Sequence, residues 1–429
     1  MSVPWLFLLV TCVGALFTFN AHLPRRPNSR FAAPSFFAGW LTGELVPHHF
    51  AWQLAATIVF VWAGALAAWP GWLGLGITFA SWAALFAMVR VARRAAPLVE
   101  AALQEGLGPD YANLALCRAG ALCDAFEPER RLVNPFRFRH RAVRVIGDLR
   151  YAEGAGKRHL LDVYTARERA DGLPPAPVLL QIHGGAWTVG HKRQQALPLL
   201  HHLAARGWVC VAINYRLSPR ARFPEHLVDV KLAIRWIREH VHEYGGDPGF
   251  LAVTGGSAGG HLTALTALTA NDPEYQPGFE QVDTRVQAAV PFYGVYDFTD
   301  RQGFDPSHRF RRFLERVVMR KRFERDREAF ERASPMSRVH ADAPPFFVIH
   351  GAHDSLVPVE DARHFVGLLR AASKAPVCYA ELPNTQHAFE IFHGLRTRSV
   401  VRGVDRFLAW VYSGWCAAQD QASAARSIR

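Results

Sequence analysis

The stretch Gly255-Gly256-Ser257-Ala258-Gly259 stands between the apolar run 250–253 and the helix-like run 261–265. A Gly-x-Ser-x-Gly sequence in this position predicts a sharp turn from a strand into a helix. Because glycine has no Cβ atom, strand and helix can approach closely, and the serine can adopt a strained backbone conformation. The pattern therefore predicts that the Ser257 hydroxyl projects from the end of a sheet, where it can act as a nucleophile.

A second glycine-rich turn lies upstream. The apolar run 178–182 predicts a buried strand, and His183-Gly184-Gly185-Ala186-Trp187 follows it. Such turns point backbone N–H groups at the oxyanion that forms when a serine attacks a carbonyl carbon. His183 is expected to hold the loop by hydrogen bonds rather than to carry a proton. The candidate oxyanion donors are the N–H groups of Gly184, Gly185, Ala186 and Ala258.

A nucleophilic serine needs a base, and the base needs a carboxylate that orients it. In the order typical of such folds, the carboxylate follows the serine along the chain and precedes the histidine. Asp354 follows the strand-like run 346–349, and His387 follows the run 377–382. Functional groups gather at strand ends in such sheets, so we predict a triad of Ser257, Asp354 and His387. The alternatives are Glu360 or Asp361 as the acid, both in a predicted helix, and His393 as the base.

Four motifs together resemble the esterase and lipase branch of the α/β-hydrolase superfamily: HGGAW at 183–187, GGSAGG at 255–260, HDSLVP at 353–358 and TQHAF at 385–389. That branch includes hormone-sensitive-lipase-like, feruloyl-esterase and arylformamidase-like enzymes, and the pattern is similar to actinobacterial membrane-associated lipases and esterases. The resemblance covers about residues 141–411. Ala186 stands where hormone-sensitive-lipase-like members usually carry a third glycine, which favours the HGGxW subgroup, whose substrates are diverse.

Strand-like and helical runs alternate from residue 141 onward, which predicts an α/β fold with a mostly parallel sheet covered by helices on both faces. The resemblance implies an eight-stranded α/β-hydrolase domain, assigned here to 141–415, that needs no metal or organic cofactor. An excursion at about 297–343, rich in phenylalanine and arginine, is expected either to cap the active site or to pack as a helical hairpin on the sheet. The predicted strands lie near 143–146, 159–164, 178–182, 208–214, 250–254, 286–292, 345–350 and 377–382.

The N-terminal third is strongly apolar. The stretches 2–19, 50–69 and 72–89 each have about the 18–20 residues that a helix needs to cross a bilayer. Seven of the twelve tryptophans precede residue 90, several near the ends of these stretches, as interfacial anchors do. We therefore predict a membrane region at 1–94 with about three transmembrane helices, joined by a Pro70-Gly71 turn between the last two. Linker helices are expected at 95–140.

Details of this region predict its orientation. The first stretch lacks a basic leader and a small-residue cleavage site, so it is expected to be an uncleaved anchor. Arginines follow the first and third stretches, whereas the Pro70-Gly71 turn has no positive charge. The positive-inside rule then places the N-terminus outside and the catalytic domain on the cytoplasmic side of the cell membrane. Residues 31–49 are expected to lie along the interface. The arginines concerned are Arg25, Arg26, Arg30, Arg90, Arg93 and Arg94.

Composition narrows the possible partners. The chain has 429 residues, is 50% hydrophobic, and carries 49 Lys and Arg against 37 Asp and Glu, a net charge of +12. No basic motif interleaved with stacking aromatics indicates nucleic-acid binding. The excess charge is expected either to attract an anionic membrane surface or to form a solvated helix face. Six scattered cysteines show no metal-ligand spacing.

The predicted function is a membrane-anchored serine carboxylesterase or lipase whose partners are an ester substrate and membrane lipids. The same residues would serve hydrolysis of a formamide, another amide or a carboxyl methyl ester. A catalytically silent membrane interaction module would require a broken triad, and none is broken in this sequence. Acyl length, alcohol group and oligomeric state remain open at this stage.

Overall fold

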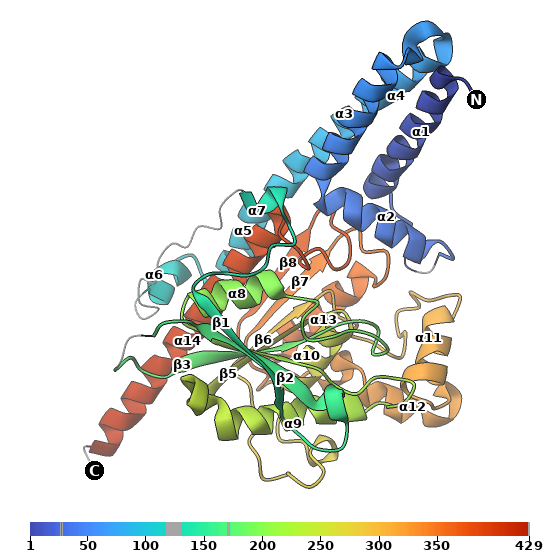
Figure 1. The fold of residues 1–429 in the computed structure, drawn as a ribbon. Coiled ribbons are helices and arrows are strands. Elements are labelled where there is room, and N and C mark those ends of the chain that lie inside the picture. The colour runs from blue at the N-terminus through green and yellow to red at the C-terminus, as the bar shows by residue number, and fades with distance from the viewer. Residues whose placement is uncertain (26, 28, 117–129, 170–171, 428–429) are drawn as a thin grey trace.

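The computed structural model describes the chain except for residues 26, 28, 117–129, 170–171 and 428–429. Arg26 of the predicted arginine clusters, and Cys117 and Cys123, therefore lie outside the described residues. The described chain consists of a large domain built around one sheet and a helical region that projects from it (Figure 1).

The sheet has eight strands in the order β1-β2-β4-β3-β5-β6-β7-β8. The strand β2 pairs antiparallel with both β1 and β4, and the other neighbours run parallel. The predicted α/β-hydrolase fold is thus confirmed, with an antiparallel opening pair. The strands are β1 Val143–Arg150, β2 Leu160–Ala166, β3 Ala176–Ile182, β4 Val209–Ile213, β5 Gly246–Gly256, β6 Ala288–Phe292, β7 Phe346–Gly351 and β8 Val377–Leu382.

Helices cover both faces of this sheet, and its strands β3, β4, β6 and β7 are buried at every position. In β3, Leu180 belongs to the core on one face and its neighbour Leu179 to the core on the other, as the alternation of side chains in a strand requires. One core includes helices α9 Glu225–His240, α10 Ala258–Leu268 and α13 Val359–Ala372. The opposite core includes α8 Leu197–Ala205 and the long C-terminal helix α14 Leu395–Ser427.

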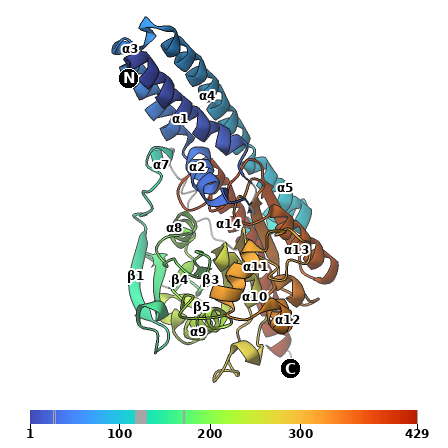
Figure 2. The ribbon, with the colours of Figure 1, turned by 90° about the vertical axis from the view of Figure 1, so that its right-hand side faces the viewer.

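The N-terminal helices α1 Val3–His22, α3 Val46–Trp62 and α4 Trp69–Arg93 form a bundle that leaves the sheet domain on one side (Figures 1 and 2). Among the described residues, α1 and the continuous helical run Trp69–Leu107 are long and apolar enough to cross a membrane. The helix α2 Ala32–Glu44 and α3 would count as a third span only as a pair, and they meet at a bend of 89°. The structure therefore contains two to three candidate spans.

The expected turn at Pro70-Gly71 lies elsewhere. The helix α3 ends at Trp62, Gly64 takes a left-handed φ of 85°, and a short 3₁₀ turn covers Ala65–Ala67. Pro70 lies in the first turn of α4, a position that proline favours because an N–H group there has no helical partner. The predicted second stretch, 50–69, therefore includes the loop, and the helix itself begins and ends earlier.

Part of the segment predicted as a linker continues the bundle. The helix α5 Ala95–Leu107 prolongs α4 and packs on β8 and α14. A β-carbon on Gly106 would lie 2.4 Å from Cys378 Sγ, so helix and strand touch at this glycine. The short helices α6 Tyr111–Leu116 and α7 Arg130–Val133 follow. Within the 297–343 excursion, α11 Arg309–Phe313, a π-helical turn Leu314–Val318 and α12 Phe323–Arg332 form.

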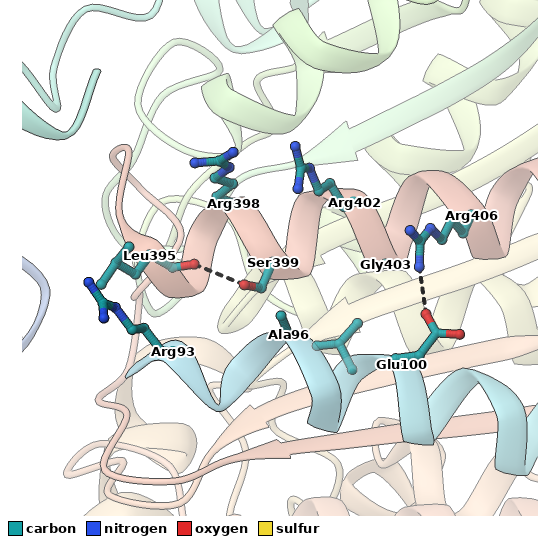
Figure 3. A pocket seen from close by; sticks show the side chains of 10 residues that line it. Arg93, Ala96, Glu100, Leu395, Arg398, Ser399, Arg402, Gly403 and Arg406 are labelled. Atoms are coloured by element: carbon teal, nitrogen blue, oxygen red, sulfur yellow. Dashed lines mark hydrogen bonds and ion pairs between the residues drawn. The ribbon is translucent and has the colours of Figure 1, made fainter. Parts of the chain in front are cut away.

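A pocket of about 280 Å³ lies between α5 and α14. Figure 3 shows Arg406 of α14 reaching Glu100 of α5, at 2.5 Å, while Arg398 and Arg402 extend from α14 away from α5. Arg93 lines the other end of the pocket. These arginines do not converge on one point. The ion pair between Arg406 and Glu100 joins the helical region to the sheet domain beside this pocket.

Candidate active site

Ser257 occupies the turn between β5 and α10 in a strained conformation, with φ 58° and ψ −120°. Its backbone N–H donates to Phe292 O at 3.0 Å. A β-carbon on Gly256 would lie 2.5 Å from the Tyr293 hydroxyl, and one on Gly259 would lie 2.1 Å from Ile182 O. The glycines are therefore required by close packing around the serine, and the strain is typical of functional turns.

The loop after β3 lies beside this serine. A β-carbon on Gly184 would lie 2.5 Å from Gly256 O and 3.1 Å from Ser257 Cβ. The loop turns sharply, with positive φ at Gly185 (114°) and Ala186 (50°). The Gly184 N–H donates to the Gln195 side chain at 2.6 Å. In this structure that amide already has a partner, so Gly185, Ala186 and Ala258 are the stronger candidates to bind an oxyanion.

His183 holds the loop after β3, which carries the candidate oxyanion donors. Its ring stacks on Tyr215 at 4.4 Å between centroids, its Nδ1 lies 2.7 Å from Gly184 O, and the Tyr215 hydroxyl donates to His183 O at 2.9 Å. Burial lowers the pKa of His183 to about 4. The imidazole is therefore neutral near pH 7.

The two other predicted triad residues are in direct contact. His387 Nδ1 lies 2.6 Å from Asp354 Oδ2, and both side chains are buried. Asp354 Oδ1 accepts the N–H groups of Leu356 and Val357 at 2.8 and 2.9 Å, and His350 Nε2 lies 3.2 Å from Oδ2. Burial alone would raise the pKa of Asp354, but His387 and His350 hold it below its ordinary value. Asp354 is thus an ionised partner for a histidine.

Gln386 joins the loop after β7, which carries Asp354, to the loop after β8, which carries His387. The sequence analysis missed this role. Its Oε1 accepts the N–H groups of Ser355 at 3.0 Å and His387 at 3.1 Å, and its Nε2 donates to Ser355 Oγ at 2.6 Å. The only sequence signal is its position directly before His387. These bonds fix the distance between the segments that carry Asp354 and His387.

Tyr293, which directly follows β6, lies between the serine turn and the histidine. Its ring centroid is 4.4 Å from that of His387, and its hydroxyl lies against the backbone of Gly256, next to Ser257. The elements that carry Ser257, Asp354 and His387 therefore meet at one edge of the sheet. The alternative residues have other surroundings: Glu360 and Asp361 lie in the first turn of α13, and the His393 ring packs on Phe138 at 5.8 Å between centroids.

The Tyr293 hydroxyl donates to Glu390, a fully buried carboxyl. Burial raises the pKa of Glu390 to about 7, whereas a glutamate in the unfolded chain titrates near 4.3. Between these values the folded protein keeps a proton that the unfolded chain releases, so stability should fall as pH rises from about 5 to 7. Thermal unfolding tests this. Between pH 5 and pH 8, the melting temperature of Glu390→Gln should change less than that of the wild type.

The exposed Glu328→Gln on α12 is the control for this measurement and should keep the wild-type pH dependence. Equal pH dependence in Glu390→Gln and wild type would contradict the assignment of the buried proton to Glu390.

The helix α2 covers the loop that carries His387. The Phe36 ring lies 6.0 Å from the His387 ring in an edge-on arrangement, and Trp40 Nε1 donates to Ala388 O at 2.9 Å. A buried ion pair of 2.9 Å joins Glu44 at the end of α2 to Arg396. The aromatic pair at spacing i, i+4 is the only sequence signal for this packing.

The excursion also contributes to the site. Phe298, Phe304 and Phe310 line a pocket with Leu356 and Val357, which follow Asp354. Phe298 also packs edge-on against Trp187 of the loop after β3, with 5.2 Å between ring centroids. The excursion is therefore in contact with the loops around the triad. Within the described residues, no group of three or more His, Cys, Asp or Glu side chains is placed to hold a metal ion.

Residues 161–369 match the family model described as BD-FAE. Over 419 residues the chain is 45% identical to the probable carboxylic ester hydrolase LipM of Mycobacterium tuberculosis, covering 95% of this chain and 93% of that relative. The chain belongs to the esterase family of the α/β-hydrolases. This esterase is also 47% identical over 327 residues to the esterase LipQ of the same organism, covering 75% of this chain and 76% of LipQ.

A solved structure, that of esterase B from Lactobacillus rhamnosis, aligns with a TM-score of 0.53 at 21% identity, covering 66% of this chain and 91% of that one. This likeness supports the fold alone. With the family established by the sequence relatives, the protein is a carboxylic ester hydrolase.

Proposed function

We propose that the protein is a membrane-anchored serine esterase that uses Ser257, His387 and Asp354 and forms an acyl-enzyme. His387 takes the Ser257 proton as the serine oxygen attacks the ester carbonyl carbon. The C–O bond of the ester breaks, and His387 passes the proton to the leaving alcohol. Water then attacks the acyl-enzyme, gives its proton to His387 and releases the acid, while Ser257 recovers a proton.

The contact that carries this proposal is the one between His387 and Asp354, because a buried ionised carboxylate on Nδ1 directs the other ring nitrogen, Nε2, toward a nucleophile. Backbone N–H groups of Gly185, Ala186 and Ala258 would stabilise the oxyanion, supported by the strained turns in which they lie. The reaction as written needs no metal or organic cofactor.

The helices α1 and α4 support anchoring in the cell membrane. Arg90 and Arg93 lie in the last turn of α4, at the end from which α5 continues to the sheet domain. Following the positive-inside rule, we place this end, and with it the catalytic domain, on the cytoplasmic side. The region 1–94 is then the membrane region and 141–415 the catalytic domain.

A fluorophosphonate probe and a p-nitrophenyl ester test the chemistry directly. The full chain in detergent should be labelled by the probe at Ser257 and should release p-nitrophenol in a burst equal to the enzyme concentration when deacylation is slower than acylation. After alkaline extraction of cells, the protein should stay in the membrane pellet. Absence of labelling would favour a catalytically silent module, and faster turnover of formamides or carboxyl methyl esters than of acyl esters would favour those alternatives.

A further inference from the structure

The helix α2 lies across the base of the N-terminal bundle. It meets α3 at 89°, and α3 runs alongside α4 in the bundle (Figures 1 and 2). If α4 crosses the bilayer along its normal, a helix perpendicular to the bundle lies in the plane of the membrane. This is the orientation that interfacial amphipathic helices adopt.

The outer face of α2, defined by Ala33, Pro34, Phe37 and Leu41, is exposed and uncharged. Phe37 is 57% exposed and Leu41 is 38% exposed, and Phe31, directly before the helix, is 50% exposed. Glu44 is the only charged residue of α2, and it is buried against Arg396. Exposed apolar residues gathered on one face typically mark a contact with a membrane or another apolar partner. The helix α2 packs on the candidate span α1, and α3, which follows α2, packs on α4 of the other candidate span; this continuity identifies that partner as the bilayer.

The inner face of the same helix contacts the candidate catalytic base. Phe36 lies against His387, Trp40 donates to Ala388 O, and a β-carbon on Gly39 would lie 3.4 Å from Gln386 Nε2. One helix of 13 residues thus carries an apolar face on one side and a wall of the active site on the other. The exposed apolar face of α2 and His387 are therefore separated by the thickness of a single helix.

Two further loops at this edge of the sheet expose apolar side chains. Val189, in the loop after β3, is 63% exposed, and Leu356, which follows Asp354, is 38% exposed. Together with the contiguous outer face of α2, they favour a substrate whose apolar part stays outside water.

We propose that α2 is an interfacial helix over which substrate enters, and that the ester hydrolysed at Ser257 belongs to a bilayer-resident amphiphile whose apolar chain lies along α2. This inference rests on the proposed function and specifies its substrate class. The reaction is the hydrolysis described above, in which water supplies the hydroxyl of the acid and the proton of the alcohol. What the structure adds is the direction of approach and the need for a long apolar chain.

Leu41→Glu on α2 and Leu368→Glu on α13 are a matched pair, because the two leucines are 38% and 40% exposed on helical surfaces. The full chain is reconstituted in phosphatidylcholine–phosphatidylglycerol vesicles and assayed with p-nitrophenyl palmitate in the bilayer and p-nitrophenyl butyrate in solution. Wild type should turn over the palmitate at least as fast as the butyrate. Leu41→Glu should lower the palmitate-to-butyrate rate ratio at least about tenfold, since a carboxylate disfavours insertion at the interface. Leu368→Glu should keep the wild-type ratio.

An unchanged ratio in Leu41→Glu, or a wild-type preference for the soluble ester, would overturn the inference. If Leu41→Glu lost both activities, Phe37→Gln would decide by the same ratio. Ser257→Ala separates the two levels of the proposal. If it abolishes both rates while Leu41→Glu leaves the ratio unchanged, only the bilayer route fails; if it retains both rates, the proposed function itself fails.

Discussion

Ser257→Ala should lower kcat/KM for a p-nitrophenyl ester by at least ~10³-fold, because the variant has no oxygen with which to form the acyl-enzyme. The residual rate would come from the oxyanion donors and substrate binding alone. Alanine is smaller than serine, and Ser257 is only partly buried, so the fold should persist; alanine keeps the Cβ atom and therefore the strained φ of 58°. Steady-state kinetics together with a thermal unfolding curve in detergent measure both effects.

Ser355→Ala is the control for this experiment. Ser355 lies beside the triad but bonds to Gln386 rather than to the reacting atoms, so its loss should cost far less activity. If Ser257→Ala kept more than about a tenth of the wild-type rate, the nucleophile would have to be another group.

Asp354→Asn should lower kcat by about 10³–10⁴-fold. The amide cannot carry the negative charge that stabilises the imidazolium, and it can hold His387 in the wrong tautomer. His350 also contacts Asp354 Oδ2 at 3.2 Å, so the variant disturbs two histidines. Steady-state kinetics with a p-nitrophenyl ester measure this loss.

Asp361→Asn tests the alternative acid. Burial and the neighbouring Asp297 and Asp300 raise the pKa of Asp361 well above its ordinary value, which favours the neutral carboxyl, and asparagine resembles that form closely. This variant should stay within a few-fold of wild type. The reverse result, with Asp361→Asn inactive and Asp354→Asn active, would move the acid from the loop after β7 into α13.

The central parallel strands were predictable because each contains a short, mostly apolar run whose neighbours are turns or amphipathic helices, as parallel strands buried on both faces do. The contact between Asp354 and His387 was predictable because both residues follow strands whose carboxyl ends share an edge. The turn after Trp62 was not, because Pro70 favours both a turn and the first turn of a helix, and the sequence does not distinguish the two.

Contacts across long sequence separations were also missed. Trp40 and Ala388 are 348 residues apart, and no local pattern in either segment indicates the other. Gln195, which binds the Gly184 N–H, and Gln386, which joins two loops, act through side-chain hydrogen bonds set by tertiary structure. Periodicity and motif spacing describe elements and strand ends, whereas such bonds depend on how the ends pack.

The helices α4 and α5, which follow one another with only Arg94 between them, make the anchor rigid as one helical run over Trp69–Leu107. At 1.5 Å per residue it extends about 58 Å, longer than a bilayer core is thick, and its last 13 residues are packed into the sheet domain as α5. In the proposed arrangement no flexible linker lets the catalytic domain move away from the membrane into the cytosol. It meets its substrate by lateral diffusion, so its turnover should depend on the mole fraction of substrate per lipid rather than on bulk concentration.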